Sequence, residues 1–245
     1  MKNKRNIQIL VFVMLCLTYG VFVSAKKIEK KDSDFVTYIV DPKKKDIRFY
    51  WKDDKHELFR SLQQVNVWLE KRNKKLEFAM NGGMYKADNS PLGLYIENQK
   101  ILSPINRKTG KGNFYIAPNG IFYITTDNVP NICMTKNFDS RNTIKYATQS
   151  GPMLLIDGQI HSAFKKGSAN VNIRNGVGIL PNHQVVFVMS KKEVNFFTFA
   201  HYFKSLGCSQ ALYLDGFISR TYLPKEKWVQ TDGNFGVIIG VTSNE

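Results

Sequence analysis

The stretch YATQSGPMLLIDGQIH, residues 146–161, contains short apolar runs separated by turn-forming residues. The first break is Gly151-Pro152, and the second is Asp157-Gly158. Asp-Gly tolerates positive φ and favours a tight hairpin, which joins antiparallel neighbours. Apolar runs of this length between turn residues are typical of strands. The stretch therefore predicts a sheet built from short, locally paired strands.

The same pattern continues on both sides of this stretch. Toward the C-terminus, Pro181-Asn182 separates two more apolar runs, and ALYLDG and FGVIIGVT have the composition of buried strands. Toward the N-terminus, Glu97-Asn98 and Pro118-Asn119-Gly120 are further hairpin signals. We expect strands at 35–40, 46–51 and 76–81, and within 91–104, 112–127, 146–161, 170–190, 211–216 and 235–242.

Two segments have helical rather than strand periodicity. In residues 57–72, Leu58, Leu62, Val65 and Leu69 recur at helical spacing. In residues 195–207 one apolar helical face ends at a glycine suited to a C-terminal cap. That face consists of Phe196, Phe199, Ala200, Phe203 and Leu206, and the glycine is Gly207. Because the two helices do not alternate regularly with strands, we expect a single α+β domain with a mixed, largely antiparallel sheet.

The first 25 residues have the order of a secretory signal. MKNKRN is basic, IQILVFVMLCLTYGVFV is apolar, and Val23-Ser24-Ala25 ends in small residues. We expect cleavage and export to the periplasm or the medium, which leaves a linker at 26–33 and a domain at 34–245. An uncleaved membrane anchor is the alternative, because the apolar run is slightly long for a signal.

The chain is strongly basic, with a formal net charge of +15 that falls to +12 without Lys2, Lys4 and Arg5 of the signal. Such a charge favours association with anionic envelope surfaces, and solvated surface lysine is the alternative. The runs KKIEKKD and PKKKD lack the interleaved aromatic residues of a nucleic-acid-binding face. We therefore expect no nucleic-acid partner.

Cysteine and histidine do not indicate a metal site. Cys133 and Cys208 lie beyond the signal, and they form either one disulfide or two separate buried thiols. The sequence has no Cys-x-x-Cys pair, and His161, His183 and His201 have no partner at metal-ligand spacing. We expect no cofactor, with a divalent cation at Asp215 as the alternative.

Two motifs combine glycine with side chains that form hydrogen bonds. Asn81-Gly82-Gly83 follows the expected strand LEFAM, where glycines let backbone N–H groups approach a ligand and the amide adds donors and an acceptor. Gln149-Ser150-Gly151 offers an amide and a hydroxyl, without the G-x-S-x-G context of a serine hydrolase. Read alone, each motif favours a plain turn.

Two further motifs add charge. Arg174 in IRNGVG offers a planar fork for a phosphate or carboxylate, with a structural ion pair as the alternative. Asp215 ends the apolar strand ALYL, where a carboxylate is costly unless it is paired or lies in a cleft. An Asp-Gly turn is the alternative there.

Taken in order, five segments resemble the phosphodiester glycosidase family, which includes the enzyme that removes N-acetylglucosamine from a phosphodiester on mannose. The segments are NGGMY, GNFYIAPNG, QSGPMLLIDG, IRNGVG and ALYLDGFISRTYLP, and the resemblance covers about residues 34–242. It implies an exported hydrolase that cleaves the anomeric bond of a sugar-1-phosphodiester, releasing free sugar and a phosphomonoester. The matching positions are Asn81, Gly82, Gly83, Gln149, Ser150, Gly151, Arg174, Asp215, Gly216 and Ser219.

The chemistry of a phosphodiester suggests roles for the matching residues, because its leaving group already carries charge and a cation that stabilises the departing phosphate gains importance. Asp215 is the candidate nucleophile, base or partner of a sugar hydroxyl, Arg174 stabilises the departing phosphate, and Asn81 holds phosphate or sugar oxygens. The run Asp215-Gly216-Phe217-Ile218 has fewer glycines than many members show, which changes the pocket wall. A non-catalytic binding or assembly protein for anionic envelope glycans on the same fold is the alternative.

Glycoside hydrolysis normally uses two carboxyl groups, one on each side of the bond. The sequence offers Asp88, Glu97 and Asp232 as candidates for the second. Trp228 and Tyr85 are candidates for stacking on a sugar ring, with core packing as the alternative use.

Overall fold

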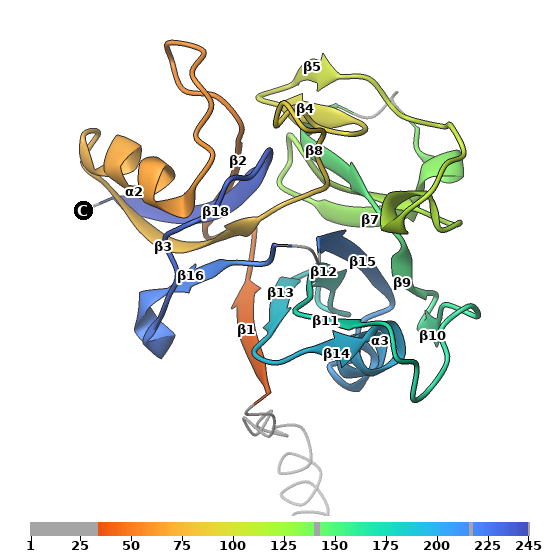
Figure 1. Cartoon of the computed structure of the whole chain (residues 1–245). Helices are drawn as coiled ribbons and strands as arrows, with labels where there is room; N and C mark the ends of the chain where they lie inside the picture. Colours follow the sequence, from red (N-terminus) through yellow and green to blue (C-terminus); the bar gives the residue numbers. More distant parts are fainter. Residues whose placement is uncertain (1–33, 140–142, 216–217, 245) are drawn as a thin grey trace, which may run out of the picture. The chain divides into compact units, whose positions relative to one another are not determined.

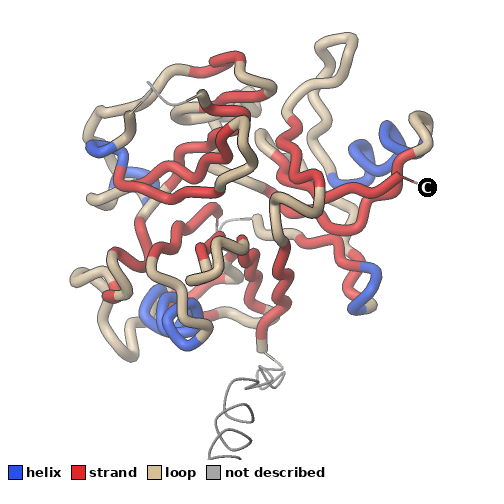
Figure 2. Tube along the Cα trace, turned by 180° about the vertical axis from the view of Figure 1, so that it is seen from behind, coloured by secondary structure: helices blue, strands red, loops and turns tan. Residues whose placement is uncertain are grey.

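The computed structural model describes residues 34–139, 143–215 and 218–244. Residues Asp34–Glu245 form one compact unit. The expected signal and linker lie outside the described residues. In the described part of the chain, strands dominate and helices are few, as Figure 2 shows. The predicted α+β class with largely antiparallel sheet and two main helices is confirmed, because every strand pair described is antiparallel.

One sheet has six strands in the order β1-β13-β12-β15-β9-β10 (Figure 1). Two neighbouring pairs, β12 with β13 and β9 with β10, follow one another in the chain. The pairs β1–β13, β12–β15 and β15–β9 join segments that are far apart in sequence. Its strands are β1 (Phe35–Val40), β13 (Val185–Ser190), β12 (Asn175–Ile179), β15 (Gln210–Asp215), β9 (Met153–Ile156) and β10 (Gln159–Ile160).

Two five-stranded sheets and a small ribbon complete the fold. The second sheet consists of β17 (Trp228–Val229), β16 (Thr221–Leu223), β3 (Lys74–Asn81), β18 (Ile238–Asn244) and β2 (Asp46–Tyr50). The third consists of β5 (Lys100–Ser103), β4 (Tyr95–Glu97), β8 (Ile144–Ser150), β6 (Gly120–Thr125) and β7 (Pro130–Met134). The ribbon pairs β11 (Val171–Asn172) with β14 (Val194–Asn195).

A shared hydrophobic core joins the three large sheets. Phe187 and Leu212 come from the first sheet, Phe78 and Ile239 from the second, and Phe122 from the third. Burial of aromatic and aliphatic side chains of this size is the main favourable contribution to folding. The core therefore fixes the strand ends of the first and second sheets relative to each other.

Helix α2 (Leu62–Glu70) lies beside β3 and β18, as Figure 1 shows, and buries Leu62, Val65 and Leu69. The prediction that it spans 57–72 is too long at its N-terminus. Ser61 caps the helix by accepting a hydrogen bond from the Gln64 N–H. Arg60 has φ +60°, which a preceding helical turn excludes.

Helix α3 (Phe196–Ser205) confirms the second helical prediction. The Asn195 side chain caps its N-terminus, and Phe196, Phe199, Ala200 and Phe203 form its buried face. Gly207 follows its C-terminus with φ +86°, a conformation that costs glycine little.

Two of the predicted hairpins are present in the structure, and a third is not. Asn98 and Gln99 turn with positive φ between β4 and β5, and Asp157 and Gly158 do so between β9 and β10, which confirms both predictions. The expected hairpin at Pro118-Asn119-Gly120 is wrong. The residues before it form the 3-10 helix η1 (Asn113–Tyr115) instead of a strand, and β6, which begins at Gly120, pairs with β7 and β8.

Candidate active site

Three strand ends meet where the first and second sheets adjoin. Asn81 ends β3 of the second sheet, whereas Asn175 begins β12 and Asp215 ends β15 of the first sheet. Asn175 and Asp215 are register partners, so their side chains belong to one cross-strand pair. The relative positions of the sheets bring Asn81 onto this pair.

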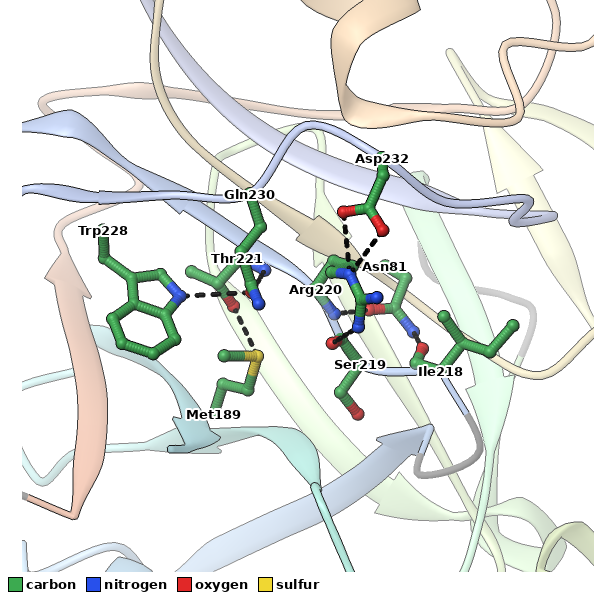
Figure 3. A network of polar contacts seen from close by, with 9 residues as sticks. All are labelled: Asn81, Met189, Ile218, Ser219, Arg220, Thr221, Trp228, Gln230 and Asp232. Atoms are coloured by element: carbon green, nitrogen blue, oxygen red, sulfur yellow. Dashed lines mark hydrogen bonds and ion pairs between the residues drawn. The ribbon is translucent and has the colours of Figure 1, made fainter. Parts of the chain in front are cut away.

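The Asn81 amide contacts the Asp215 carboxylate directly. Nδ2 of Asn81 donates to Oδ2 of Asp215 at 3.1 Å and to the Ile218 carbonyl at 2.8 Å. Its Oδ1 accepts from the Arg220 backbone N–H at 3.0 Å. Figure 3 shows Asn81 between Ile218 and Arg220. Asn81 has no exposed surface and Asp215 is 7% exposed, so this is a desolvated contact in which hydrogen bonds fix the orientation.

Asn175 ties the other two residues together. Its Nδ2 donates to Oδ1 of Asn81 at 2.8 Å and to the Asn81 carbonyl at 2.9 Å. Its Oδ1 accepts from the Asp215 backbone N–H at 2.8 Å. The two amides thus form a closed polar network that holds the Asp215 carboxylate in one position. Sequence reasoning chose Arg174 and missed Asn175, although an amide at the glycine-rich start of a strand was the available signal.

Ser219 and Arg220 support this network from the chain that follows Asp215. The Ser219 hydroxyl lies 3.1 Å from the Ile173 carbonyl and 3.2 Å from the Asp215 carbonyl. The Arg220 guanidinium pairs with the exposed Asp232 carboxylate at 2.8 Å (Figure 3), and this hydrogen bond lowers the pKa of Asp232. Ser219 therefore lies beside Asp215, as the motif implied. Gly216, also expected here, lies outside the described residues.

Asp215 lines a cavity of about 480 Å³. Among the described residues that line it, Asp215 is the one carboxylate, and Lys86 and Lys111 are the cations. Burial, together with the negative charge of Asp215, raises the pKa of Tyr85 in the cavity wall. The remaining lining residues are Met84, Ala87, Asn89, Leu92, Gly112, Asn113, Phe114, Tyr115, Ile218 and Asn234.

The wall near Asn89 is held by a separate set of hydrogen bonds. Nδ2 of Asn89 donates to the Asn234 carbonyl at 3.0 Å and to the Phe235 carbonyl at 3.2 Å. Its Oδ1 accepts from Nη1 of Arg60 at 2.9 Å. These bonds join two loops that contribute to the cavity.

Arg174 lies on the opposite side of β12 from Asn175, because successive residues of a strand point to opposite faces. It has no exposed surface, and it is not among the residues that line the Asp215 cavity. Its Nε donates to the Val194 carbonyl at 2.8 Å and its Nη2 to the Asn170 carbonyl at 2.8 Å. The sequence predicted that the Arg174 guanidinium would stabilise the departing phosphate. In the structure the guanidinium is buried among backbone carbonyls, away from the Asp215 cavity.

Arg174 still has an indirect connection to the cavity. Its Nη1 donates to the Tyr213 hydroxyl at 3.1 Å, and this hydroxyl is also hydrogen-bonded to the side chain of Asn113, which lines the cavity. The guanidinium carbon lies 3.7 Å above the centre of the Phe196 ring. Burial lowers the pKa of Arg174. Its contacts are those of a residue that supports other side chains.

Gln149 and Ser150 are buried, and their side chains form hydrogen bonds with backbone groups. Oε1 of Gln149 accepts from the Leu94 N–H at 2.9 Å and from the Asn106 N–H at 2.8 Å, while its Nε2 donates to the Asn106 carbonyl at 2.7 Å. The Ser150 hydroxyl donates to the Leu214 carbonyl at 2.8 Å. Gln149 thus fixes the loop that runs toward Lys111, and Ser150 fixes the strand that ends at Asp215.

The predicted glycines are needed for close packing. A Cβ atom at Gly82 would lie 2.4 Å from Cγ1 of Ile239, and one at Gly83 would lie 2.5 Å from Oγ1 of Thr148. At Gly151 a Cβ would lie 2.6 Å from Cβ of Asn119. These positions bring β3 and β8 close to their neighbours, and none of the three glycines lines the Asp215 cavity.

Of the other carboxylate and aromatic candidates, only Tyr85 is among the described residues that line the Asp215 cavity. Asp88, Glu97 and Asp232 do not line the Asp215 cavity. Glu97 accepts a hydrogen bond from the Tyr95 hydroxyl at 2.5 Å, and burial raises its pKa. Tyr85 lines the cavity, whereas Trp228 packs against the core and donates to Gln230.

Cys133 and Cys208 are separate free thiols, of which Cys208 is buried and Cys133 is half-buried. Burial raises the pKa of Cys133 to about 11 and that of Cys208 to about 12. Within the described ranges, no group of three His, Cys, Asp or Glu side chains is placed to hold a metal ion.

Comparison with solved structures defines the class of fold. The chain is similar to the catalytic domain of zebrafish N-acetylglucosamine-1-phosphodiester alpha-N-acetylglucosaminidase, auto-inhibited by its pro-peptide, with a TM-score of 0.59, 14% identity and coverage of 87% of this chain and 85% of that one. A putative exported protein from Burkholderia pseudomallei gives a TM-score of 0.54, with 9% identity over 84% of this chain and 73% of that one. These likenesses show the fold.

The sequence defines the family. Residues 74–239 match the phosphodiester glycosidase family, and the chain belongs to it. It is also 38% identical over 187 residues to the uncharacterized protein YigE of Escherichia coli strain K12, which covers 76% of this chain and 73% of that protein. The predicted resemblance is confirmed.

Proposed function

We propose that this chain hydrolyses the anomeric bond of a sugar-1-phosphodiester and releases free sugar and a phosphomonoester. The observation that carries the proposal is the Asp215 carboxylate, which Asn81 and Asn175 hold in place and which lines the same cavity as Lys86 and Lys111. This cavity offers a carboxylate to sugar hydroxyls or water and ammonium groups to a phosphate. Membership of the phosphodiester glycosidase family supports the assignment.

In this reaction the oxygen of water forms a bond to the anomeric carbon. The bond from that carbon to the phosphate oxygen breaks, and its electron pair leaves with the phosphomonoester. Asp215 either accepts the proton of the attacking water or attacks the anomeric carbon itself before water displaces it. The Asn81 amide, which Asn175 fixes in turn, donates to this carboxylate and keeps it oriented for either step.

The departing phosphate needs little protonation, because it is already a stable anion. Positive charge placed where the leaving group develops its charge stabilises the transition state. Lys86 and Lys111 are suited to this role, since both line the cavity, whereas Arg174 donates to the Val194 and Asn170 carbonyls. This charge arrangement orients the sugar toward Asp215 and the phosphate toward the lysines.

The reaction is tested by following oxygen-18 from labelled water into the products of a chromogenic sugar-1-phosphodiester. The proposal expects the label in the anomeric hydroxyl of the released sugar. Label in the phosphate instead would show cleavage of a phosphorus–oxygen bond and overturn the proposal. Enzyme-free buffer at the same pH is the control for spontaneous hydrolysis.

A binding protein for anionic envelope glycans is the second candidate. It is favoured by the single carboxylate among the described cavity residues, because most glycosidases use two. Calorimetry separates the candidates: a binding protein takes up the intact diester and returns it unchanged, whereas the hydrolase releases sugar in the same cell.

We also propose that the protein acts outside the cytoplasm. The support is the basic and apolar order of residues 1–25. Cell fractionation followed by N-terminal sequencing tests it, with a mature N-terminus near Lys26 as the expected result. Retention of the full chain in the cytoplasmic fraction would contradict it.

A further inference from the structure

A second cavity, of about 400 Å³, adjoins the candidate active site along the chain. Tyr115 lines the Asp215 cavity, and the next residue, Ile116, lines the second cavity. Tyr115 ends η1, and Ile116 is extended with φ −66° and ψ 114°. The two cavities are therefore lined at one point by consecutive residues of the chain.

The buried side chain of Arg174 contacts two residues that line the second cavity. Arg174 donates from Nη2 to the Asn170 carbonyl at 2.8 Å and to Oδ1 of Asn170 at 3.0 Å, and its guanidinium lies against the Phe196 ring. Asn170 and Phe196 both line the second cavity. The Phe164 ring stacks on Phe196 with centroids 4.9 Å apart. Arg174 does not line the Asp215 cavity, but its contacts hold Asn170 and Phe196 in the wall of the second cavity.

The loop that closes the second cavity presents two cations. Lys165 and Lys166 line it and are exposed. The loop is held in shape by hydrogen bonds from the Ser168 N–H to the Lys165 carbonyl at 3.3 Å and from Nδ2 of Asn195 to the Ser168 carbonyl at 3.2 Å. No carboxylate is among the residues that line this cavity in the described part of the chain. Its charge is therefore complementary to an anion.

We propose that the second cavity binds the next repeating unit of an anionic glycan whose terminal sugar-1-phosphate occupies the Asp215 cavity. This inference rests on the proposed function and narrows its substrate class to polymers or oligomers with repeated sugar phosphates. Consecutive residues, Tyr115 and Ile116, line the two cavities, and a pair of lysines is among the lining residues of each. Repeated cations in the two cavities match the repeated charges of such a chain.

The test compares two substrates in the full-length protein. One is a chromogenic sugar-1-phosphodiester with a single phosphate, and the other is a defined oligomer of the same sugar joined through phosphodiesters. The variant Lys165→Glu/Lys166→Glu reverses the charge of the second cavity. The matched control is Lys43→Glu/Lys44→Glu, which makes the same change at exposed lysines that line neither cavity.

We expect the cavity variant to lose about tenfold or more in kcat/KM on the oligomer, and less than about twofold on the single-phosphate substrate. The control variant should change kcat/KM on the two substrates by the same small factor. An equal loss on both substrates, or an oligomer loss as large in the control, would overturn the second site. Unchanged kinetics on the oligomer would overturn it as well.

Failure of the proposed hydrolysis gives a different result. If wild type cleaves neither substrate, equilibrium binding of the oligomer is measured instead by fluorescence anisotropy. The second site then requires about tenfold weaker oligomer binding in Lys165→Glu/Lys166→Glu than in the control. Equal binding by the two variants would reject the inference independently of catalysis.

Discussion

Nδ2 of Asn81 lies 3.1 Å from Oδ2 of Asp215, although 134 positions separate the two residues in the chain. Both are buried, so the contact is desolvated. It joins the end of β3 in one sheet to the end of β15 in another, and the amide orients the carboxylate. This relationship is the basis of the predictions about activity that follow.

Asn81→Asp should raise the pH at which activity appears. The new carboxylate would face Oδ2 of Asp215 at the distance where two ionised groups repel strongly, so the pKa of the pair would rise. A base with a raised pKa is ionised only at higher pH. The acid limb of the kcat/KM profile should therefore move upward by about one unit or more.

Asn81→Ala is the matched variant for that experiment. It removes the same hydrogen bond without adding charge, so activity should fall and the acid limb should move upward by less than in Asn81→Asp, because loss of a donor raises the pKa of a carboxylate less than a second negative charge does. An acid limb in Asn81→Asp that coincides with wild type would contradict the contact with a catalytic carboxylate.

Arg174→Met should cost stability more than chemistry. The change leaves the carbonyl of the buried Val194 and the hydroxyl of the buried Tyr213 without their donor, and each lost partner of a buried group costs about 1–3 kcal/mol. Urea denaturation should show a loss of about 2–4 kcal/mol, with kcat on the single-phosphate substrate within about tenfold of wild type. Unchanged stability together with a kcat loss near a thousandfold would restore the direct role in phosphate binding.

Much of this arrangement could be predicted from the sequence. Periodicity and turn residues located most strands and both helices, and ordered motifs placed Asn81 and Asp215 in one site. The choice between Arg174 and Asn175 could not be made, because it depends on which face of β12 meets the second sheet. A shift of one residue in register exchanges the two faces. Lys86 and Lys111 were missed because exposed loop lysines look alike in sequence.

Ser150→Ala should leave catalysis nearly intact. The hydroxyl is buried and donates to the Leu214 carbonyl, so it lacks the base and the access that a nucleophile needs. We expect a stability loss of about 1 kcal/mol and a kcat within about threefold of wild type. Thermal unfolding and steady-state kinetics measure the two effects, and loss of activity in a stably folded variant would show that Ser150 takes part in the reaction.

Cys133 and Cys208 should resist thiol reagents in the folded protein. Burial raises their pKa values to about 11 and about 12, so both stay protonated at pH 8, and the thiolate is the reactive form. Iodoacetamide labelling followed by peptide mass spectrometry should show slow modification at both positions, and rapid modification in urea. Rapid labelling of Cys208 without denaturant would contradict its buried position.

The most direct test of the central claim is the kcat/KM of Asp215→Asn on a chromogenic sugar-1-phosphodiester, measured beside Ser150→Ala. Asparagine keeps the size of the side chain and removes the charge that accepts a proton or attacks carbon. We expect a loss of about 10²–10⁴-fold in Asp215→Asn, with a melting temperature close to that of wild type. An Asp215→Asn protein that keeps activity within about twofold of wild type would contradict the assignment of Asp215 as the catalytic carboxylate.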